Sequence, residues 1–187
     1  MNLMKKIFLV TLVGVFALIT GSVTASAHSN MRTPIDYRKS SETIPYPDIS
    51  KLKDPWIKVS INKNRVYIMS GNKAVYTMYC SAGKYENKDG KRVSTTPTGT
   101  FAIQSERGNS FYNPSVKCGA NNYVSWHDNG SYLFHSVPTD KDGHYIKSEA
   151  AKLGKTTASH GCVRLSIPDS KWMMNMPEGT KVVVQDN

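Results

Sequence analysis

Short runs of alternating hydrophobic and polar side chains dominate the sequence between residues 56 and 103. Residues 57–61 alternate apolar and polar side chains, and the alternation resumes at 66–68 after an Asn-Lys-Asn turn. Residues 74–79 and 100–103 follow further Gly- or Pro-containing turns and are rich in β-branched and aromatic residues. This pattern predicts a meander of at least three short strands, followed by another strand.

The next part of the chain is more polar. Residues 84–94 predict a charged loop, and residues 104–122, with their Gly, Pro, Asn and Ser, predict a long loop. Two strands are expected at 123–126 and 132–137, because the Asn-Gly pair between them is a strong hairpin signal. Residues 148–153, which end before a glycine, predict one or two helical turns.

The C-terminal part predicts strand, helix and strand. Residues 163–167 alternate as a strand, and Pro168-Asp169 then opens a short helix with Trp172 and nearby methionines on its apolar side. A final strand is expected at 181–185. The fold class is therefore mainly β, with one or two short helices, over a domain at residues 55–187.

The N-terminus predicts export. Lys5 and Lys6 precede an apolar run at 7–19, which is shorter than a bilayer-spanning helix and is followed by Ala25-Ser26-Ala27. Residues 1–27 are thus expected to be a signal peptide, cleaved before His28. The alternative is an uncleaved membrane anchor. Residues 28–54 contain several prolines and few large apolar side chains, which indicates a linker or a loosely draped N-terminal arm.

Composition and charge narrow the class of partner. With 187 residues, 39% of them hydrophobic, 13 Gly and 9 Pro, the chain is neither collagen, a low-complexity tail nor a multi-span membrane protein. The net charge is +10, and loss of residues 1–27 removes two lysines and leaves +8. An exported protein does not normally meet nucleic acid, so anionic cell-wall polymers are the expected acidic partner; simple solubility explains the charge equally well.

Cys162 has the chemical surroundings of a nucleophile. It stands in Ser159-His160-Gly161-Cys162-Val163-Arg164, where imidazole and guanidinium groups favour the thiolate and Gly161 allows close approach of backbone N–H groups. His135, at the end of a predicted strand, could supply a general base. The alternative is that Cys162 is a small buried side chain, the commonest fate of a free cysteine.

Three motifs resemble the catalytic domain of the L,D-transpeptidases, which cross-link bacterial peptidoglycan. They are Thr96-Pro97-Thr98-Gly99-Thr100-Phe101, then Phe134-His135-Ser136, then Ser159-His160-Gly161-Cys162-Val163-Arg164, in the family's order. The resemblance covers roughly residues 56–184 and implies an L,D-transpeptidase-like β-sandwich. It also implies acyl transfer on peptidoglycan stem peptides and acylation of the same thiolate by carbapenems.

The resemblance assigns roles to individual residues. It makes Cys162 the nucleophile and His135 the general base, whose ring Ser136 holds through its backbone carbonyl. His160 and Gly161 would shape the pocket and the oxyanion site, whereas Ser159 and Arg164 would contact or support the substrate. The interval between His135 and Ser159 is longer than in many members, which leaves the shape of the substrate entrance open.

Other functions remain as alternatives. Water in place of an acceptor amine would make the protein an L,D-carboxypeptidase, and loss of catalysis would leave a wall-binding module. A zinc site built from Cys162 and the histidines at 127, 135, 144 and 160 is disfavoured, because no pair has i, i+4 helical spacing and no acidic partner is near. We therefore expect a monomeric enzyme with no metal and no cofactor.

The two remaining cysteines allow a disulfide. Outside the cytoplasm, Cys80 and Cys118 could form a bridge that encloses 37 residues. Two separate thiols are the alternative, because sequence does not place the two Cα atoms within bonding range.

Overall fold

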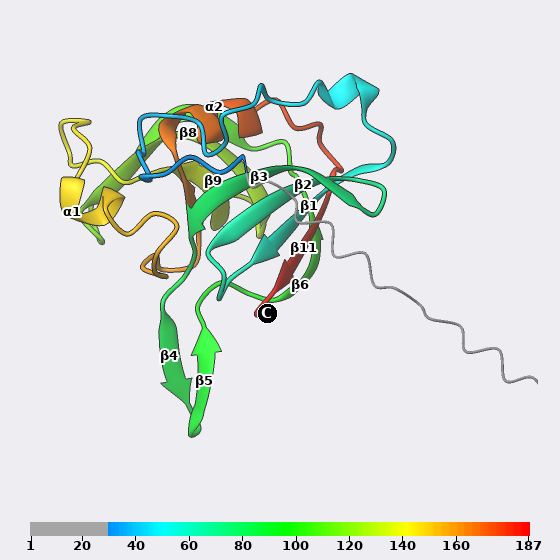
Figure 1. The fold of residues 1–187 in the computed structure, drawn as a ribbon. Coiled ribbons are helices and arrows are strands. Elements are labelled where there is room, and N and C mark those ends of the chain that lie inside the picture. Colours follow the sequence, from blue (N-terminus) through cyan, green and yellow to red (C-terminus); the bar gives the residue numbers. More distant parts are fainter. Residues whose placement is uncertain (1–29) are drawn as a thin grey trace, which may run out of the picture.

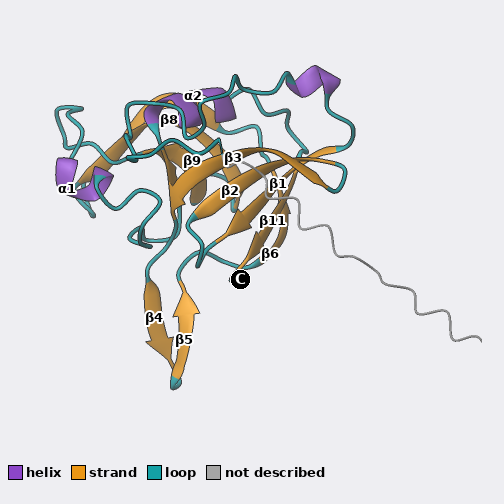
Figure 2. Ribbon diagram, in the orientation of Figure 1, coloured by secondary structure: helices purple, strands orange, loops and turns teal. Residues whose placement is uncertain are grey.

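The computed structural model describes residues 30–187, so the predicted signal peptide and its cleavage site lie outside the described residues. Within residues 30–187, no helix has the length and apolar character needed to cross a membrane. The ribbon is mostly strand, with short helices at its surface (Figures 1 and 2). The strands are β1 (Pro55–Ser60), β2 (Arg65–Ser70), β3 (Lys73–Ser81), β4 (Tyr85–Lys88), β5 (Lys91–Ser94), β6 (Gly99–Ala102), β7 (Arg107–Asn113), β8 (Cys118–His127), β9 (Tyr132–Ser136), β10 (Val163–Leu165) and β11 (Lys181–Gln185).

Nine of these strands form one curled sheet. Their order is β6-β11-β1-β2-β3-β10-β9-β8-β7, with parallel pairing only between β1 and β11 and between β9 and β10. The curl brings β6 against β8, where the Phe101 and Trp126 rings meet edge to face with centroids 5.1 Å apart. The two halves of the sheet therefore enclose a common core, and the expected mainly β class with short helices is confirmed.

The core consists of the apolar positions that alternate along the strands. Ile57, Val59, Val66 and Ile68 are completely buried, because successive side chains of a strand point to opposite faces. Trp126 is buried with them. The strands expected at 57–61, 66–68 and 74–79 are thus present as β1, β2 and β3.

Three short helices complete the described part of the fold. The 3-10 helix η1 (Ile49–Lys51) lies in the N-terminal arm, and α1 (Lys147–Ala150) lies between β9 and β10, where it overlaps the helical turns predicted at 148–153. Helix α2 (Ile167–Met173) packs on β8, β9 and β10. Its N-terminus is capped by Ser166 Oγ, which accepts from Asp169 N–H at 3.2 Å, and a proline occupies its first turn as the sequence indicated.

The expected loop at 84–94 is instead a hairpin. Strands β4 and β5 pair with each other, and Figure 1 shows the hairpin projecting away from the nine-stranded sheet. Asp89 and Gly90 form its turn with φ values of 51° and 76°, and this left-handed conformation is what a two-residue Asp-Gly turn requires. The alternation of apolar residues missed the hairpin because neither face of it is buried in the core.

The prediction of a long loop at 104–122 is also wrong. Residues 107–113 form β7, and β8 begins at Cys118 rather than at 123. Strand β7 is an edge strand with no buried residue, so it has no apolar alternation for a sequence pattern to detect. These two strands form one side of the cavity described below.

The N-terminal arm is fastened to the sheet by its side chains. Glu42 Oε1 accepts a hydrogen bond from Thr77 N–H at 2.8 Å, and Ser41 Oγ accepts one from Tyr79 N–H at 2.7 Å. These β3 groups need partners because β10 pairs with β3 only at residues 80 and 81. Asp169 on α2 accepts from both Ser41 Oγ and Tyr46 Oη. The sequence left a linker or a loosely draped arm as alternatives. Residues 30–54 form an arm, and these hydrogen bonds hold it closely against β3 and α2.

The Asp169→Ala variant should therefore be less stable by about 2–4 kcal/mol, because it leaves the hydroxyl groups of buried Ser41 and half-buried Tyr46 without their acceptor. Urea denaturation measures this change. Asp36→Ala is the matched control: Asp36 pairs with the exposed Arg38 of the same arm, and such solvent-exposed pairs contribute little to stability. Equal losses of stability in the two variants would contradict the conclusion that Asp169 fastens the N-terminal arm to α2.

Candidate active site

A cavity of about 370 Å³ lies where the β7–β8 hairpin faces the start of β10. It is lined by Glu106, Phe111, Asn113, Val116, Cys118, Tyr123, Gly130, Ser131, Leu133, His135, Ser159, His160, Cys162 and Arg164. Of the seven residues predicted to form the site, five line this cavity. Ser136 and Gly161 do not line it, but they are the chain neighbours of His135 and Cys162, which do.

His135 is held as a neutral base. It lies on β9 with 5% of its surface exposed, and its Nδ1 is 2.6 Å from the carbonyl oxygen of Ser136. A carbonyl only accepts hydrogen bonds, so Nδ1 carries the proton and Nε2 is left with a lone pair. Burial, together with the charge of Arg164, lowers the pKa of His135 to about 4. The imidazole is therefore unprotonated at neutral pH.

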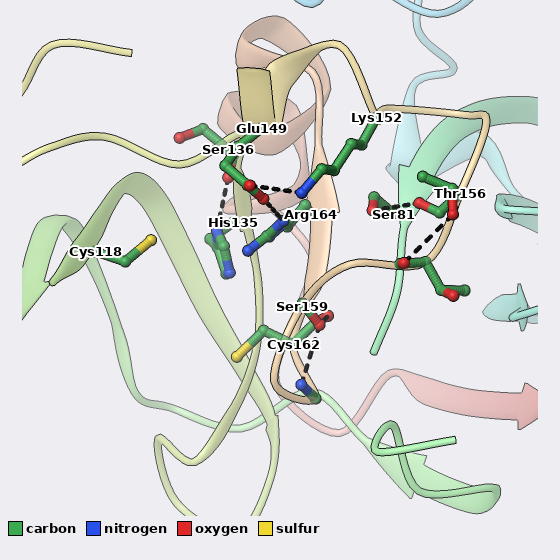
Figure 3. Close-up of polar contacts among 12 residues, drawn as sticks. Ser81, Cys118, His135, Ser136, Glu149, Lys152, Thr156, Ser159, Cys162 and Arg164 are labelled. Atoms are coloured by element: carbon green, nitrogen blue, oxygen red, sulfur yellow. Dashed lines mark hydrogen bonds and ion pairs between the residues drawn. The ribbon is translucent and has the colours of Figure 1, made fainter. Parts of the chain in front are cut away.

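Cys162 directly precedes β10, and its thiol opens into the same cavity (Figure 3). Its Sγ lies 3.6 Å from the carbonyl oxygen of Ser131, and no hydrogen bond joins it to His135 among the described residues. Burial raises the pKa of the Cys162 thiol above its ordinary value, although the nearby Arg164 charge acts in the opposite direction. The resting pair is therefore a neutral thiol and a neutral imidazole, not an ion pair.

The loop before Cys162 is fixed by hydrogen bonds to a second segment. Thr96 Oγ1 donates to the carbonyl of Gly161 at 2.7 Å and accepts from Gly83 N–H at 2.7 Å. Gly161 N–H donates to Ser159 Oγ at 3.0 Å, and Ser159 Oγ in turn donates to the carbonyl of Cys162. The Gly161 N–H expected to bind an oxyanion is therefore already engaged in this structure.

Gly161 is required by its conformation. Its φ is +148°, and a Cβ at this position would lie 2.8 Å from the ring of Tyr132 and 3.1 Å from the carbonyl of Thr95. Any larger residue would push the loop away from β9. The Thr-Pro-Thr-Gly motif that begins at Thr96 thus lies next to the Ser-His-Gly-Cys motif, because Thr96 and Gly161 are joined by a hydrogen bond.

Arg164 lies on β10 in register with His135 on β9. Its side chain is 7% exposed, and its Nη1 donates to Glu149 Oε2 at 2.7 Å. The other oxygen of Glu149 accepts from Lys152 Nζ at 2.6 Å. Figure 3 shows these three charged side chains together, on the other side of His135 from Cys118.

The predicted disulfide is absent, and the alternative of two separate thiols is the arrangement found. Cys80 is fully buried on β3, whereas Cys118 begins β8 and lines the cavity. Strands β10 and β9 lie between β3 and β8, and neighbouring strands are about 4.8 Å apart, which is too far for an S–S bond. Burial raises the pKa of Cys80 to about 12, so this thiol is chemically inert.

The histidines of residues 30–187 do not form a common ligand cluster. His144 is exposed on the β9–α1 connection, and His127 stacks on Tyr132 with centroids 5.2 Å apart. Within residues 30–187, the only group of three or more ligand-type side chains close enough to share an ion is Asp140, Asp142 and His144, outside the cavity. The zinc set that the sequence analysis disfavoured is therefore not brought together in the described part of the chain.

Two features in or next to the cavity escaped the sequence analysis. Cys118 was considered only as a disulfide partner, and Glu149, the ion-pair partner of Arg164, was not singled out. The i, i+3 spacing of Glu149 and Lys152 in the sequence indicates an ion pair between them. This spacing is common on exposed helices, however, and does not show that Arg164 lies next to Glu149. Register between β9 and β10 brings Arg164 to this place, and sequence does not supply that register.

Fold and cavity together define a cysteine-containing enzyme of the L,D-transpeptidase class. The chain matches the L,D-transpeptidase catalytic domain family (YkuD) over residues 54–184, and it belongs to that family. The resemblance inferred from the three motifs is thereby confirmed.

A curated relative agrees with this assignment, and two solved structures share the fold. The Bacillus subtilis (strain 168) protein named "Putative L,D-transpeptidase YciB" is 48% identical over 154 residues, which are 82% of this chain and 76% of the relative. An L,D-transpeptidase from Mycobacterium smegmatis has a similar fold, with a TM-score of 0.52, 19% identity and coverage of 71% of this chain and 58% of that one. The structure of the L,D-transpeptidase LdtMt1 in complex with imipenem also has a similar fold, with a TM-score of 0.53, 19% identity and coverage of 71% of this chain and 59% of that one. The chain thus spans less than two thirds of these two solved chains.

Proposed function

We propose that this protein is an exported L,D-transpeptidase in which Cys162 transfers an acyl group between peptidoglycan stem peptides. The observation that carries the proposal is the shared cavity of Cys162 and His135, with Nδ1 of His135 fixed by the Ser136 carbonyl. A base with its free nitrogen on the cavity side is what a neutral thiol needs in order to attack a carbonyl.

The first half-reaction forms a thioester. The Cys162 proton passes to Nε2 of His135 as the sulfur attacks the carbonyl carbon of the third-position diamino acid of a tetrapeptide. The C–N bond to the terminal D-Ala then breaks, and the imidazolium returns its proton to the departing amine. Ser136 supports this cycle by holding the tautomer, and the His160–Gly161 loop is proposed to meet the oxyanion, with Gly161 N–H exchanging its bond to Ser159.

The second half-reaction releases the acyl group. An amine of a neighbouring stem attacks the thioester carbonyl, His135 takes the amine proton, and Cys162 leaves as a thiolate that recovers this proton. Water in place of the amine gives the free tripeptide, which is L,D-carboxypeptidase activity. No metal or cofactor has a part in either half-reaction, and Ser159 and Arg164 are proposed to hold the donor.

The location of this activity is part of the same proposal. The signal-like residues 1–27 and the net charge of +8 that remains after their removal fit an enzyme exported to an anionic cell wall. We further propose that the enzyme acts as a monomer and does not bind nucleic acid.

Mass spectrometry of muropeptides tests the proposed reaction. Purified protein incubated with tetrapeptide muropeptides should yield dimers joined from the third residue of the donor, together with free D-Ala. Tripeptides without dimers would instead identify a carboxypeptidase. Unchanged tetrapeptides under conditions in which the protein is folded would leave the wall-binding module as the better explanation.

The pH dependence of thiol reactivity tests the resting state of the pair. Because burial raises the pKa of Cys162, the thiolate fraction grows with pH throughout the neutral range, and its alkylation by iodoacetamide should rise about tenfold per pH unit. Because the pKa of His135 is about 4, titration of His135 adds no step to this pH profile between pH 5 and 8. Alkylation followed by intact mass in a Cys118→Ser background measures this rate. A rate independent of pH between 5 and 8 would show a preformed ion pair.

A further inference from the structure

Glu106 is the only acidic residue among those of residues 30–187 that line the cavity of Cys162. It directly precedes β7, and its side chain is exposed. Its carboxylate has neither a hydrogen bond nor an ion pair among the described residues. Glu149, by contrast, is paired with Arg164 and with Lys152. The cavity therefore has one negative charge that no group of the described chain neutralises.

The register of the strands places Glu106 at the level of the nucleophile. One row of paired residues crosses the sheet from Val163 of β10, through β9 and β8, to Arg107 of β7. Strands β7 and β10 run in the same direction, because β7 and β9 are each antiparallel to β8 and β9 is parallel to β10. Cys162 directly precedes Val163, and Glu106 directly precedes Arg107. The two residues therefore stand at the same level of the sheet, with β8 and β9 between them.

The turn between β8 and β9 connects the carboxylate of Glu106 to the surroundings of the thiol. The carboxylate lies over Gly130, since a Cβ added at Gly130 would be 3.5 Å from both Cδ and Oε1 of Glu106. The next residue, Ser131, has its carbonyl oxygen 3.6 Å from Sγ of Cys162. A group held by Glu106 is therefore presented along this turn, next to the sulfur that would carry the acyl group.

The second half-reaction brings a cation to this cavity. Its acceptor is an amine, and an aliphatic amine such as that of lysine has an ordinary pKa of about 10.4, so it arrives as an ammonium group at neutral pH. The chain has a net charge of +8 after loss of residues 1–27, and this overall charge repels an ammonium group. Arg164 adds a further positive charge at the cavity wall. An unpaired carboxylate beside the nucleophile is the feature that offsets this repulsion locally.

We propose that Glu106 binds the ammonium group of the acceptor stem and thereby favours aminolysis of the thioester over its hydrolysis. This inference rests on the proposed function. The bound ammonium group releases one proton to water, and the neutral amine then attacks the thioester carbonyl while His135 takes the proton that the attack sets free. Water is uncharged, so Glu106 gives it no comparable attraction to the site.

Two acceptors of different charge test the contact directly. A stem tripeptide with a free side-chain amine is cationic at neutral pH, whereas hydroxylamine is a nucleophile that is uncharged there. Attack on the thioester gives a dimer with the first and a hydroxamate with the second, and mass spectrometry measures both beside the tripeptide that hydrolysis forms. Glu106→Gln should raise the KM for the stem acceptor about 3–10-fold, between the effects of an exposed ion pair and of a charged hydrogen bond. The KM for hydroxylamine should equal that of wild type.

Three further variants assign the effect to the charge of Glu106. Glu106→Lys should raise the KM for the stem acceptor more than Glu106→Gln does, because it places a cation where the ammonium group binds, whereas Glu106→Asp keeps the charge and should restore most of the affinity. Glu178→Gln is the matched control: it removes the same charge from an exposed residue in the turn before β11, outside the cavity, and should keep the wild-type KM. Added salt should raise the KM for the stem acceptor in wild type but not in Glu106→Gln, because it screens the attraction that this variant lacks.

The outcomes distinguish this inference from the proposed function. A Glu106→Gln variant that keeps the wild-type KM for the stem acceptor, or that loses the stem acceptor and hydroxylamine by the same factor, would overturn the acceptor site and leave transpeptidation intact. Slower release of D-Ala by Glu106→Gln in the absence of any acceptor would also overturn it, because the carboxylate would then bind an ammonium group of the donor. Failure of the proposed function would appear in wild type itself, as no D-Ala release, no product with either acceptor and no carbapenem adduct on Cys162.

Discussion

Cys162→Ala should abolish both dimer formation and covalent reaction with a carbapenem, whereas wild type should gain one adduct per chain. The sulfur is the atom that forms the acyl bond, so its removal eliminates the pathway rather than slowing it. Loss of thiol catalysis corresponds to a decrease of about 10⁴-fold or more in rate. Intact-protein mass spectrometry measures the adduct, and peptide mapping locates it.

The other cysteines provide matched controls for this experiment. Cys118→Ala removes a thiol from the same cavity, yet it should keep the adduct, because the proposed mechanism assigns the acyl bond to Cys162. Cys80 is inert because it is fully buried. An adduct that persists in Cys162→Ala and disappears in Cys118→Ala would transfer the nucleophile to Cys118 and reject the proposed mechanism.

The sequence predicted those parts of the fold in which one face of a strand is buried. Strands β1 and β2 were identified because Ile57, Val59, Val66 and Ile68 alternate with polar residues and lie in the core. The β4–β5 hairpin and β7 were missed because they bury almost nothing and have no such pattern. Apolar alternation reports burial, so strands that extend into solvent escape it.

The N-terminal arm illustrates a second limit. Its attachment depends on polar side chains, such as Ser41 and Glu42, which replace a strand partner for β3. Hydrogen bonds of this kind depend on the length of β10, which pairs with β3 at only two positions. Composition alone cannot distinguish such an arm from a linker, because polar, proline-containing sequence is common to both.

The candidate site was predictable in its residue types but not in its support. Cys162 and His135 were chosen for their chemistry, and the structure places them in one cavity through the parallel register of β9 and β10. Glu149 was missed because its importance depends on the burial of Arg164, which a charged residue in a sequence does not reveal. Long-range register therefore determines which of many polar residues join the site.

His135→Ala should slow carbapenem acylation and dimer formation by about 10²–10⁴-fold, the usual contribution of a positioned general base. The expected cause is specific: Cys162 has a raised pKa, so at neutral pH it depends on Nε2 of His135 to take its proton during the attack. The loss should consequently shrink as pH rises and the thiolate forms without help. His144→Ala, a change of the exposed histidine on the β9–α1 connection, is the control and should react at the wild-type rate. Time-resolved mass spectrometry at several pH values measures the acylation rate of all three proteins. A His135→Ala rate equal to that of wild type at neutral pH would exclude His135 as the base. A rate deficit in His135→Ala that stays constant as pH rises would mean that His135 acts other than by accepting the Cys162 proton.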